Sequence, residues 1–218
     1  MSAAPASLEP PVLDDRAFQA AVGANAAQMA DVRAFFGLLA TWNGQMNLVG
    51  PSALGEFWGR HALDSAQLRL IAPEARTWVD LGAGAGFPGL VLAILAKNQD
   101  GACIHLVESM TKRCRFLQAV IDALDLPAVV HNVRAESLTL KVDVVTARAC
   151  APMVKLLGYA WPYLRAGATG LFLKGQDVEV ELQDAATSWK FQADLIPSIS
   201  HVDGRIARLK KVSRVRPV

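Results

Sequence analysis

The sequence predicts an α/β fold built on a mostly parallel β-sheet that ends in an antiparallel hairpin. From Thr77 onward, short apolar runs alternate with helical patterns, which is typical of a parallel sheet covered on both faces. A glycine-rich turn over residues 82–89 joins the first apolar run to the first helix of this part. The last two expected strands are joined only through residues 197–204. That connection is too short for a helical crossover, so these strands should pair antiparallel.

The N-terminal part is expected to be helical after a short irregular segment. Residues 1–12 are rich in Ala, Ser and Pro and are expected to be disordered. Between residues 15 and 42, apolar residues recur at three- and four-residue spacing, which predicts one or two amphipathic helices. Asn25 or Asp31 can cap one of these helices.

A turn and a further helix are expected to follow. Residues 42–52 favour a turn, and a helical stretch over residues 53–70 should end before Pro73. We therefore expect residues 13–76 to form a helical appendage. It should pack as one compact unit with a sheet domain over residues 77–218.

The sheet domain is expected to alternate between strands and helices. Strands are expected at 77–81, 103–108, 128–133, 142–147, 169–174, 191–199 and 206–213. Helices are expected at 89–97, 111–124, 153–164 and 177–188.

The composition is typical of an ordered cytoplasmic protein. The 218 residues are 52% hydrophobic, which supplies a core for one large domain or a domain with an appendage. The longest apolar stretch, residues 87–96, is about half of the ~20 residues that a membrane helix needs, and no signal peptide is recognisable. Cys103, Cys114 and Cys150 are odd in number and lack C-x-x-C spacing, which argues against disulfides and a zinc site. We expect a monomer with reduced thiols and no membrane partner.

The glycine-rich turn predicts a nucleotide-type cofactor. Gly84, Gly86 and Gly89 satisfy the G-x-G-x-x-G pattern, so NAD and FAD must be considered. Asp80, at the end of the preceding strand, would repel their pyrophosphate, and no Lys or Arg lies between Asp80 and Leu95 to compensate. S-adenosylmethionine carries an amine and a sulfonium cation instead of a phosphate, so Asp80 favours this cofactor. Together with the terminal hairpin, this indicates the Rossmann-like fold of class I S-adenosylmethionine-dependent methyltransferases.

Further candidate site residues follow the second expected strand. Glu108 ends that strand and can accept hydrogen bonds from both ribose hydroxyls of an adenosine-containing ligand. The next helix opens with the basic residues Lys112, Arg113 and Arg115. Because ligands bind at the carboxyl edge of such sheets, Lys112 and Arg113 could hold a polyanionic substrate. The alternative is a solvated helix face.

A second basic segment lies at the C-terminal end, although the net charge of the chain is only +2. From Gly204 onward there is no acidic residue. The basic side chains of this segment are Arg205, Arg208, Lys210, Lys211, Arg214 and Arg216. They form a local basic surface on a nearly neutral protein.

Several longer motifs resemble those of the bacterial 16S ribosomal RNA guanine-N7 methyltransferase G family, also known as the glucose-inhibited division protein B family. Together they span about residues 38–209. The motifs are W-N-x(3)-N-L at 42–48, R-H-x-x-D-S at 60–65, D-x-G-x-G-x-G-F-P-G at 80–89, V-E-S-x(2)-K-R-x(2)-F-L at 107–117, R-x-E at 134–136, R-A at 148–149 and L-K-G at 173–175. The resemblance implies methylation of N7 of a guanine, G527, in the 530 loop of 16S ribosomal RNA. The implied partner is this RNA or the small ribosomal subunit.

The resemblance also implies roles for individual residues. Gly82 and Phe87 match the family's S-adenosylmethionine contacts, and so do Ala135, Glu136 and Arg148, with Ala135 and Glu136 suited to the adenine ring. Arg148 could bind the methionine carboxylate or a substrate phosphate, or instead pair with an acidic neighbour, Asp143 or Glu108.

Positioning and RNA contact are expected of further residues. We expect Arg148, His61 and Asn47 to position the reactants. The family's last strand usually carries an Arg, which here corresponds to Arg205 or Arg208, and we expect both to contact RNA.

The expected chemistry needs no general base. Guanine N7 has an in-plane lone pair and no proton to remove, so attack on the sulfonium methyl group requires alignment alone. Cys150 leaves open carbon-5 methylation of cytosine, which uses a cysteine nucleophile. Other open functions are a small-molecule methyltransferase, an NAD-binding redox module and an inactive RNA-binding protein with the same fold.

Overall fold

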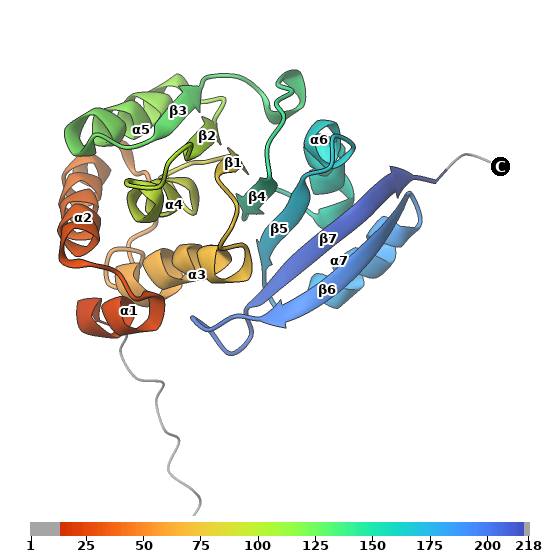
Figure 1. Ribbon diagram of the computed structural model, residues 1–218, viewed down its shortest axis with the longest axis horizontal. Coiled ribbons are helices and arrows are strands. Elements are labelled where there is room, and N and C mark those ends of the chain that lie inside the picture. The colour runs from red at the N-terminus through yellow and green to blue at the C-terminus, as the bar shows by residue number, and fades with distance from the viewer. Residues whose placement is uncertain (1–13, 216–218) are drawn as a thin grey trace, which may run out of the picture.

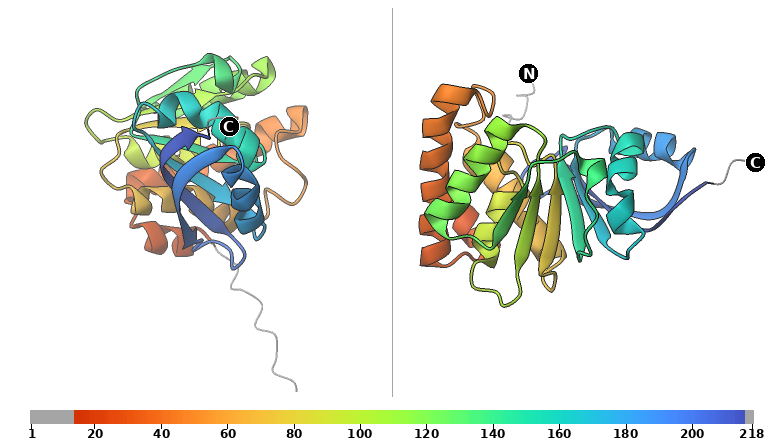
Figure 2. Two further views of the ribbon diagram at one scale, coloured as in Figure 1. Left: turned by 90° about the vertical axis from the view of Figure 1, so that its right-hand side faces the viewer. Right: turned by 90° about the horizontal axis from the view of Figure 1, so that it is seen from above.

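The computed structural model describes residues 14–215, so the expected disorder of residues 1–12 lies outside the described part. The chain forms one seven-stranded sheet with helices on both faces (Figures 1 and 2). The strand order is β3-β2-β1-β4-β5-β7-β6. The strands are β1 (Thr77–Leu81), β2 (Cys103–Val107), β3 (Ala128–His131), β4 (Val144–Arg148), β5 (Thr169–Lys174), β6 (Trp189–Pro197) and β7 (Arg205–Arg214).

Strand directions agree with the sequence prediction. β1 to β5 run parallel, whereas β7 pairs antiparallel with both β5 and β6. The chain proceeds from β1 outward to β2 and β3 and then returns to add β4 on the other side of β1. This reversal is the point where open α/β sheets bind ligands, outside the carboxyl ends of the strands.

Helices on the two faces bury separate apolar clusters. The helices are α1 (Asp15–Val22), α2 (Ala26–Met46), the π-helix η1 (Phe57–Leu63), α3 (Asp64–Ile71), α4 (Gly89–Ala96), α5 (Thr111–Leu124), the 3₁₀-helix η2 (Ala135–Ser137), α6 (Met153–Leu164) and α7 (Val178–Ala186). Residues from α1 to α5 share a core with one sheet face, and residues from α6 and α7 share a core with the other. None of these helices, within residues 14–215, is long and apolar enough to cross a membrane.

Aromatic packing joins the N-terminal helices to the sheet. The ring of Phe35, on α2, lies 5.3 Å from that of Phe87, 5.8 Å from Phe57 and 6.5 Å from Phe116, centroid to centroid. Phe35, Phe57 and Phe116 are fully buried. The N-terminal helices therefore contribute to the same core that supports the glycine-rich turn.

The expected turn from residue 42 is wrong over its first five residues, because α2 continues to Met46. Trp42 packs on Phe116 of α5, with 5.8 Å between ring centroids, and this tertiary contact outweighs the local turn signals. Asn47 then ends the helix in the left-handed conformation, at φ 49°. Asn25 caps the other end through a capping box with Gln28, as one of the two predicted caps.

The helix expected over residues 53–70 is also divided. Turns precede Phe57, the π-helix η1 covers Phe57–Leu63, and α3 continues from Asp64. Short π-helical segments are frequent at functional sites. η1 contains the arginine and histidine of the R-H-x-x-D-S motif.

Candidate cofactor and substrate cleft

A cleft of about 1100 Å³ opens at the carboxyl edge of the parallel strands. The glycine-rich turn after β1 and the ends of β4 and β5 form its floor. The π-helix η1 and the loop between β6 and β7 form parts of its wall. Segments far apart in the sequence therefore meet at the edge where ligands are expected.

Backbone conformation shapes the glycine-rich turn. Gly82, Gly84 and Gly86 have φ values of 72°, 55° and 90°, in the left-handed region that favours glycine. The Gly82 and Ala83 amides donate to the Val107 carbonyl at the end of β2, at 2.9 and 3.0 Å. A Cβ on Gly82 would lie 3.1 Å from Cys150 Sγ, so a larger residue would crowd the cleft floor.

Asp80 lies fully buried beneath this turn. Its Oδ2 accepts a hydrogen bond from the Gly89 amide at 2.9 Å, whereas its Oδ1 is buried and has no hydrogen-bond partner among residues 14–215. Burial raises the pKa of Asp80 to about 7, although the Gly89 amide and the Arg148 charge oppose the shift. A buried acceptor without a partner is costly, and a cationic ligand group would satisfy it. The site therefore fits S-adenosylmethionine, as expected from the sequence.

Glu108 holds the glycine-rich turn in place. Its Oε2 accepts from the Gly84 amide at 3.0 Å and its Oε1 from the Met110 amide at 2.8 Å. Arg113 lies 3.7 Å from Oε2. Each carboxylate oxygen has a second lone pair, so these contacts leave acceptor capacity for ribose hydroxyls.

Arg148, His61 and Phe87 form a stacked cluster at the floor of the cleft. Arg148 Nη1 lies 2.6 Å from His61 Nδ1 and donates to the Arg60 carbonyl at 3.1 Å. The His61 ring stacks on Phe87 with 5.0 Å between centroids, and the Arg148 guanidinium carbon also lies 5.0 Å from the Phe87 ring centre. Burial, followed by the nearby arginine charges, lowers the pKa of His61 to about 4. His61 is therefore neutral, with Nδ1 accepting from Arg148.

Arg148 does not form either of the acidic pairs considered from the sequence. Asp143 instead accepts from the backbone amides of Arg76 and Thr77, both at 2.9 Å. Glu108 is held by the Gly84 and Met110 amides. The Arg148 side chain is thus free of an ion pair with these two carboxylates and lines the cleft.

Asp80 and Glu108 support the glycine-rich turn from within and do not themselves line the cleft. Three more of the predicted cofactor and positioning residues also lie outside its lining. Ala135 and Glu136 are in η2, where Ala135 is half-buried and Glu136 is exposed, 3.9 Å from Arg134. Asn47 is exposed at the end of α2, while its neighbours Leu48 and Val49 line the cleft.

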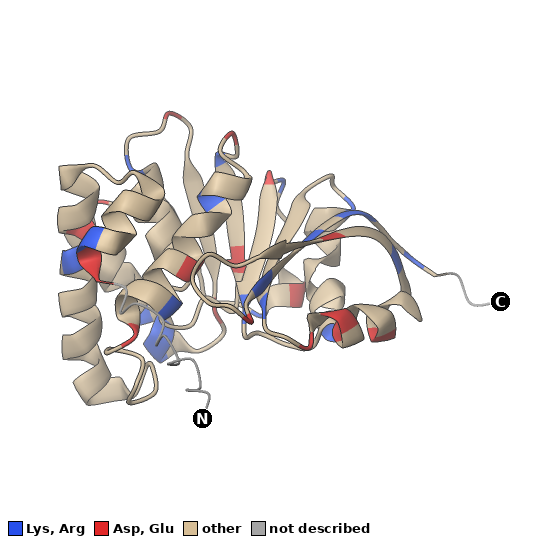
Figure 3. Cartoon of the chain, turned by 90° about the horizontal axis from the view of Figure 1, so that it is seen from below, with Lys and Arg blue, Asp and Glu red and all other residues tan. Residues whose placement is uncertain are grey.

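Three of the four predicted RNA-binding residues lie at or near the cleft. Arg113 lines the cleft, and Lys112 is exposed beside it on α5. Arg205 pairs in register with Lys174, at the end of β5 that borders the cleft. Lys and Arg are interspersed with Asp and Glu over the face seen in Figure 3.

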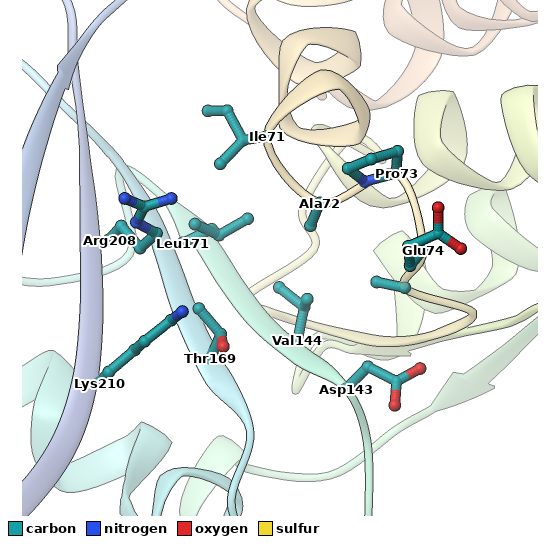
Figure 4. A pocket seen from close by; sticks show the side chains of 11 residues that line it. Ile71, Ala72, Pro73, Glu74, Asp143, Val144, Thr169, Leu171, Arg208 and Lys210 are labelled. Carbon is teal, nitrogen blue, oxygen red and sulfur yellow. The ribbon is translucent and has the colours of Figure 1, made fainter.

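Arg208 is not brought to the cleft. It forms an ion pair with Asp194 at 2.9 Å and lines a separate cavity of about 410 Å³ with Lys210 (Figure 4). Pro73, in the turn after α3, lies on the other side of this cavity. Arg205 is therefore the better placed of the two predicted arginines for contact with a ligand in the cleft.

Sequence reasoning gave no role to two polar groups in the cleft. Lys174 pairs with Glu181 at 2.6 Å and donates to the Ala151 carbonyl at 2.9 Å. Asp64 accepts hydrogen bonds from Ser198 and Ser200 of the β6–β7 loop. Both residues belong to motifs visible in the sequence, L-K-G and R-H-x-x-D-S, but their partners lie elsewhere in the chain.

Cys150 lines the cleft beside the glycine-rich turn. Burial raises the pKa of its thiol, and the Asp80 and Glu108 carboxylates add to the shift. A thiol held protonated is a poor nucleophile, which argues against covalent carbon-5 chemistry.

Comparison with known proteins identifies the family. A model of the family described as rRNA small subunit methyltransferase G matches residues 28–207. The ribosomal RNA small subunit methyltransferase G of Caulobacter vibrioides (strain NA1000 / CB15N) is 63% identical over 205 residues, covering 94% of this chain and 95% of the relative. The protein of the same name from Methylorubrum populi is 44% identical over 199 residues, covering 90% and 93%. A solved S-adenosylmethionine-dependent methyltransferase from Aquifex aeolicus shares the fold at 14% identity, with a TM-score of 0.53 and coverage of 80% of this chain and 98% of that chain. The chain belongs to the rRNA small subunit methyltransferase G family.

Proposed function

We propose that the protein methylates N7 of a guanine in 16S ribosomal RNA, G527 of the 530 loop, with S-adenosylmethionine as the methyl donor. The observation that carries the proposal is the buried Oδ1 of Asp80, which has no hydrogen-bond partner within the described chain and lies beneath the glycine-rich turn. This acceptor is complementary to a cationic group of the cofactor. The same turn contains Gly82, Gly84 and Phe87, and Glu108 holds it in place. We propose that these residues contact the cofactor together with Asp80.

The size of the cleft supports two bound reactants. Sites for one small ligand usually enclose roughly 300–1,000 Å³, and this cleft encloses about 1100 Å³. An RNA base reaches such a site after it leaves its stack. Arg60, Arg113 and Arg148 line the cleft and provide positive charge for the flanking phosphates.

The chemistry requires positioning more than proton transfer. When bound, S-adenosylmethionine supplies an electrophilic methyl group on its sulfonium. Guanine N7 presents a lone pair and no proton, so the protein needs only to align the two reactants and exclude water. His61 and Cys150 suit this assignment, because one is held neutral by Arg148 and burial and the other is held as a thiol. We assign positioning to Arg148 and His61 and, less directly, to Asn47, and assign the adenine contact to Ala135 and Glu136.

The decisive experiment maps modified nucleosides in 16S ribosomal RNA by mass spectrometry. Cells with and without the gene should differ by one 7-methylguanosine in the 530 loop. The parental gene should restore it, whereas an Asp80→Ala gene should not. An unchanged modification map would refute the proposed substrate, and a different methylated nucleoside would refute the proposed N7 chemistry.

A further inference from the structure

The loop between β6 and β7, residues 198–204, combines a place at the cleft with exposed apolar side chains. Ser200, His201 and Asp203 line the cleft. Beside them, Ile199 and Val202 are 53% and 83% exposed. Within residues 14–215, these two large apolar side chains are left largely uncovered, on one short loop beside a polar cleft.

The first half of this loop is held by a partly buried polar network. Asp64 Oδ1 accepts from Ser200 Oγ at 2.8 Å and from Ser198 Oγ at 3.3 Å. Gln67, which is 2% exposed, accepts from the Ile199 amide at 2.9 Å and donates to Ser198 Oγ at 2.9 Å. These bonds join residues more than 130 positions apart in the sequence and fix the loop to α3, directly after η1.

The second half of the loop is closed by Arg205. Its Nη1 donates to the Val202 carbonyl at 2.8 Å and to the Gly204 carbonyl at 2.7 Å. A loop with many satisfied polar groups loses little conformational freedom when it binds a ligand. Ile199 and Val202 are therefore presented from a preorganised support.

Positive charge lies on the same side of the molecule. Arg60 and Arg148 line the cleft next to this loop, and Arg205 lies at its base, so these three arginines outnumber Asp203, the acidic residue of the loop. A partner that fits this rim has anionic groups next to flat apolar surfaces. Nucleotides have both, because each carries a phosphate and the two faces of a base.

We propose that the loop 198–204 is an RNA wedge, in which Ile199 and Val202 pack against the nucleotides that flank the methylated base. This inference rests on the proposed function. Enzymes that act on a base must extrude it from its stack, and apolar side chains often occupy the space between unstacked bases. A rigid loop suits this task, since a mobile loop would yield to the stack instead of separating it.

The test compares the Ile199→Ser/Val202→Ser double variant with the parental protein. Activity is measured on small ribosomal subunits from cells that lack the gene. Unstacking is measured by fluorescence of a 530-loop RNA that carries 2-aminopurine beside the target guanine. We expect kcat/KM to fall at least tenfold and the fluorescence increase on binding to be lost. Cofactor affinity and the salt dependence of RNA binding should stay unchanged, because no charge is removed.

Two controls separate the wedge from general effects of apolar exposure. Val129→Ser removes a 44% exposed valine on β3, at the far edge of the sheet, and should leave activity and fluorescence at parental levels. Ile199→Leu/Val202→Ile keeps the apolar character of both side chains and should retain most of the activity.

The outcomes distinguish the wedge from the proposed function. If the parental protein methylates the subunits and the double variant matches it in rate and fluorescence, the wedge is wrong and the function stands. Loss of activity with an unchanged fluorescence signal would also overturn it, because the loop would then contact another part of the subunit. Failure of the parental protein to methylate ribosomal RNA would overturn both.

Discussion

Protonation of Asp80 should couple cofactor binding to pH. Burial raises the pKa of this carboxyl from 3.8 to about 7, so the ligand-free folded protein holds the proton more tightly than the unfolded chain. The stabilisation from the neutral form is fully present below pH 3.8 and is lost as the pH rises to about 7. At about 1.4 kcal/mol per pKa unit, raising this pKa from 3.8 to about 7 corresponds to about 4 kcal/mol of folding free energy.

A cationic cofactor should reverse this preference, because it stabilises the carboxylate. At pH 5, two units below the pKa, only about 1% of Asp80 is ionised, so affinity should be about 100-fold lower than at pH 8 if only the carboxylate binds. Binding near pH 6 should release close to one proton. Asp80→Asn removes the charge with little change of shape, and should weaken binding at pH 8 by about 10- to 100-fold, the loss of a charged hydrogen bond of about 1.5–3 kcal/mol.

Isothermal titration calorimetry from pH 5 to 8, in buffers of different ionisation enthalpy, measures both quantities. The Asp80→Asn variant is the matched control, because it retains every other titrating group of protein and cofactor. Its affinity should vary much less with pH than that of the parental protein. Equal proton release and equal pH dependence in the two proteins would refute the placement of the cofactor cation beside Asp80. Gly82→Asp should prevent binding at every pH, since its side chain would enter the floor of the cleft near Cys150.

Three further variants test other parts of the structure. Asn25→Ala removes the α2 capping box and should cost about 1 kcal/mol, which lowers Tm by roughly 2–4 °C in a calorimetric scan; an unchanged Tm would mean that the cap does not stabilise the helix. The double variant Lys112→Ala/Arg113→Ala should weaken RNA binding and flatten its salt dependence. The log–log slope should change by about 0.7 for each phosphate that these side chains bind in the parental protein. An unchanged slope would mean that these residues form a solvated helix face and do not bind RNA. Cys150→Ser should keep most of the single-turnover methyl-transfer rate, whereas a drop of about 100-fold with a normal melting curve would favour covalent catalysis.

The strands of the sheet were largely predictable from the sequence. The expected strands at 77–81 and 169–174 and the helix at 111–124 have the observed bounds of β1, β5 and α5. Strands buried on both faces are short, continuous apolar runs, and turn-forming residues mark their ends. The antiparallel terminal hairpin followed from loop length alone, because a short connection cannot cross over.

The N-terminal helices were less predictable, because tertiary contacts decide their limits. Local signals at residues 42–46 favour a turn, yet the Trp42 ring packs on Phe116 of α5 and keeps these residues in α2. The π-helical winding of Phe57–Leu63 has no recognisable signal in the apolar pattern. Both features depend on residues that are distant in the sequence.

The parts of the candidate site that follow from strand order were predictable, whereas side-chain contacts between distant segments were not. Asp80, Gly82 and Glu108 end adjacent parallel strands or follow them, so topology alone places them together. The contact between Arg148 and His61 spans 87 positions and joins β4 to η1, and no spacing rule predicts it. Arg205 and Arg208 could not be separated by sequence, but the register of β7 on β5 puts only Arg205 beside the cleft.

The R-H-x-x-D-S motif is difficult to interpret from the sequence because its residues contact different parts of the fold. The Arg60 carbonyl and the His61 ring nitrogen receive Arg148 from β4, while Asp64 receives the serines of the β6–β7 loop. Ser65 Oγ donates back to the His61 carbonyl at 2.6 Å and so supports the π-helical segment itself. Replacing the His61 or Asp64 side chain would leave a polar group of another segment without its partner, a cost of about 1–3 kcal/mol. The spacing of the motif is therefore set jointly by β4 and the terminal hairpin. For this reason, the structural role of the motif cannot be recognised from either segment alone.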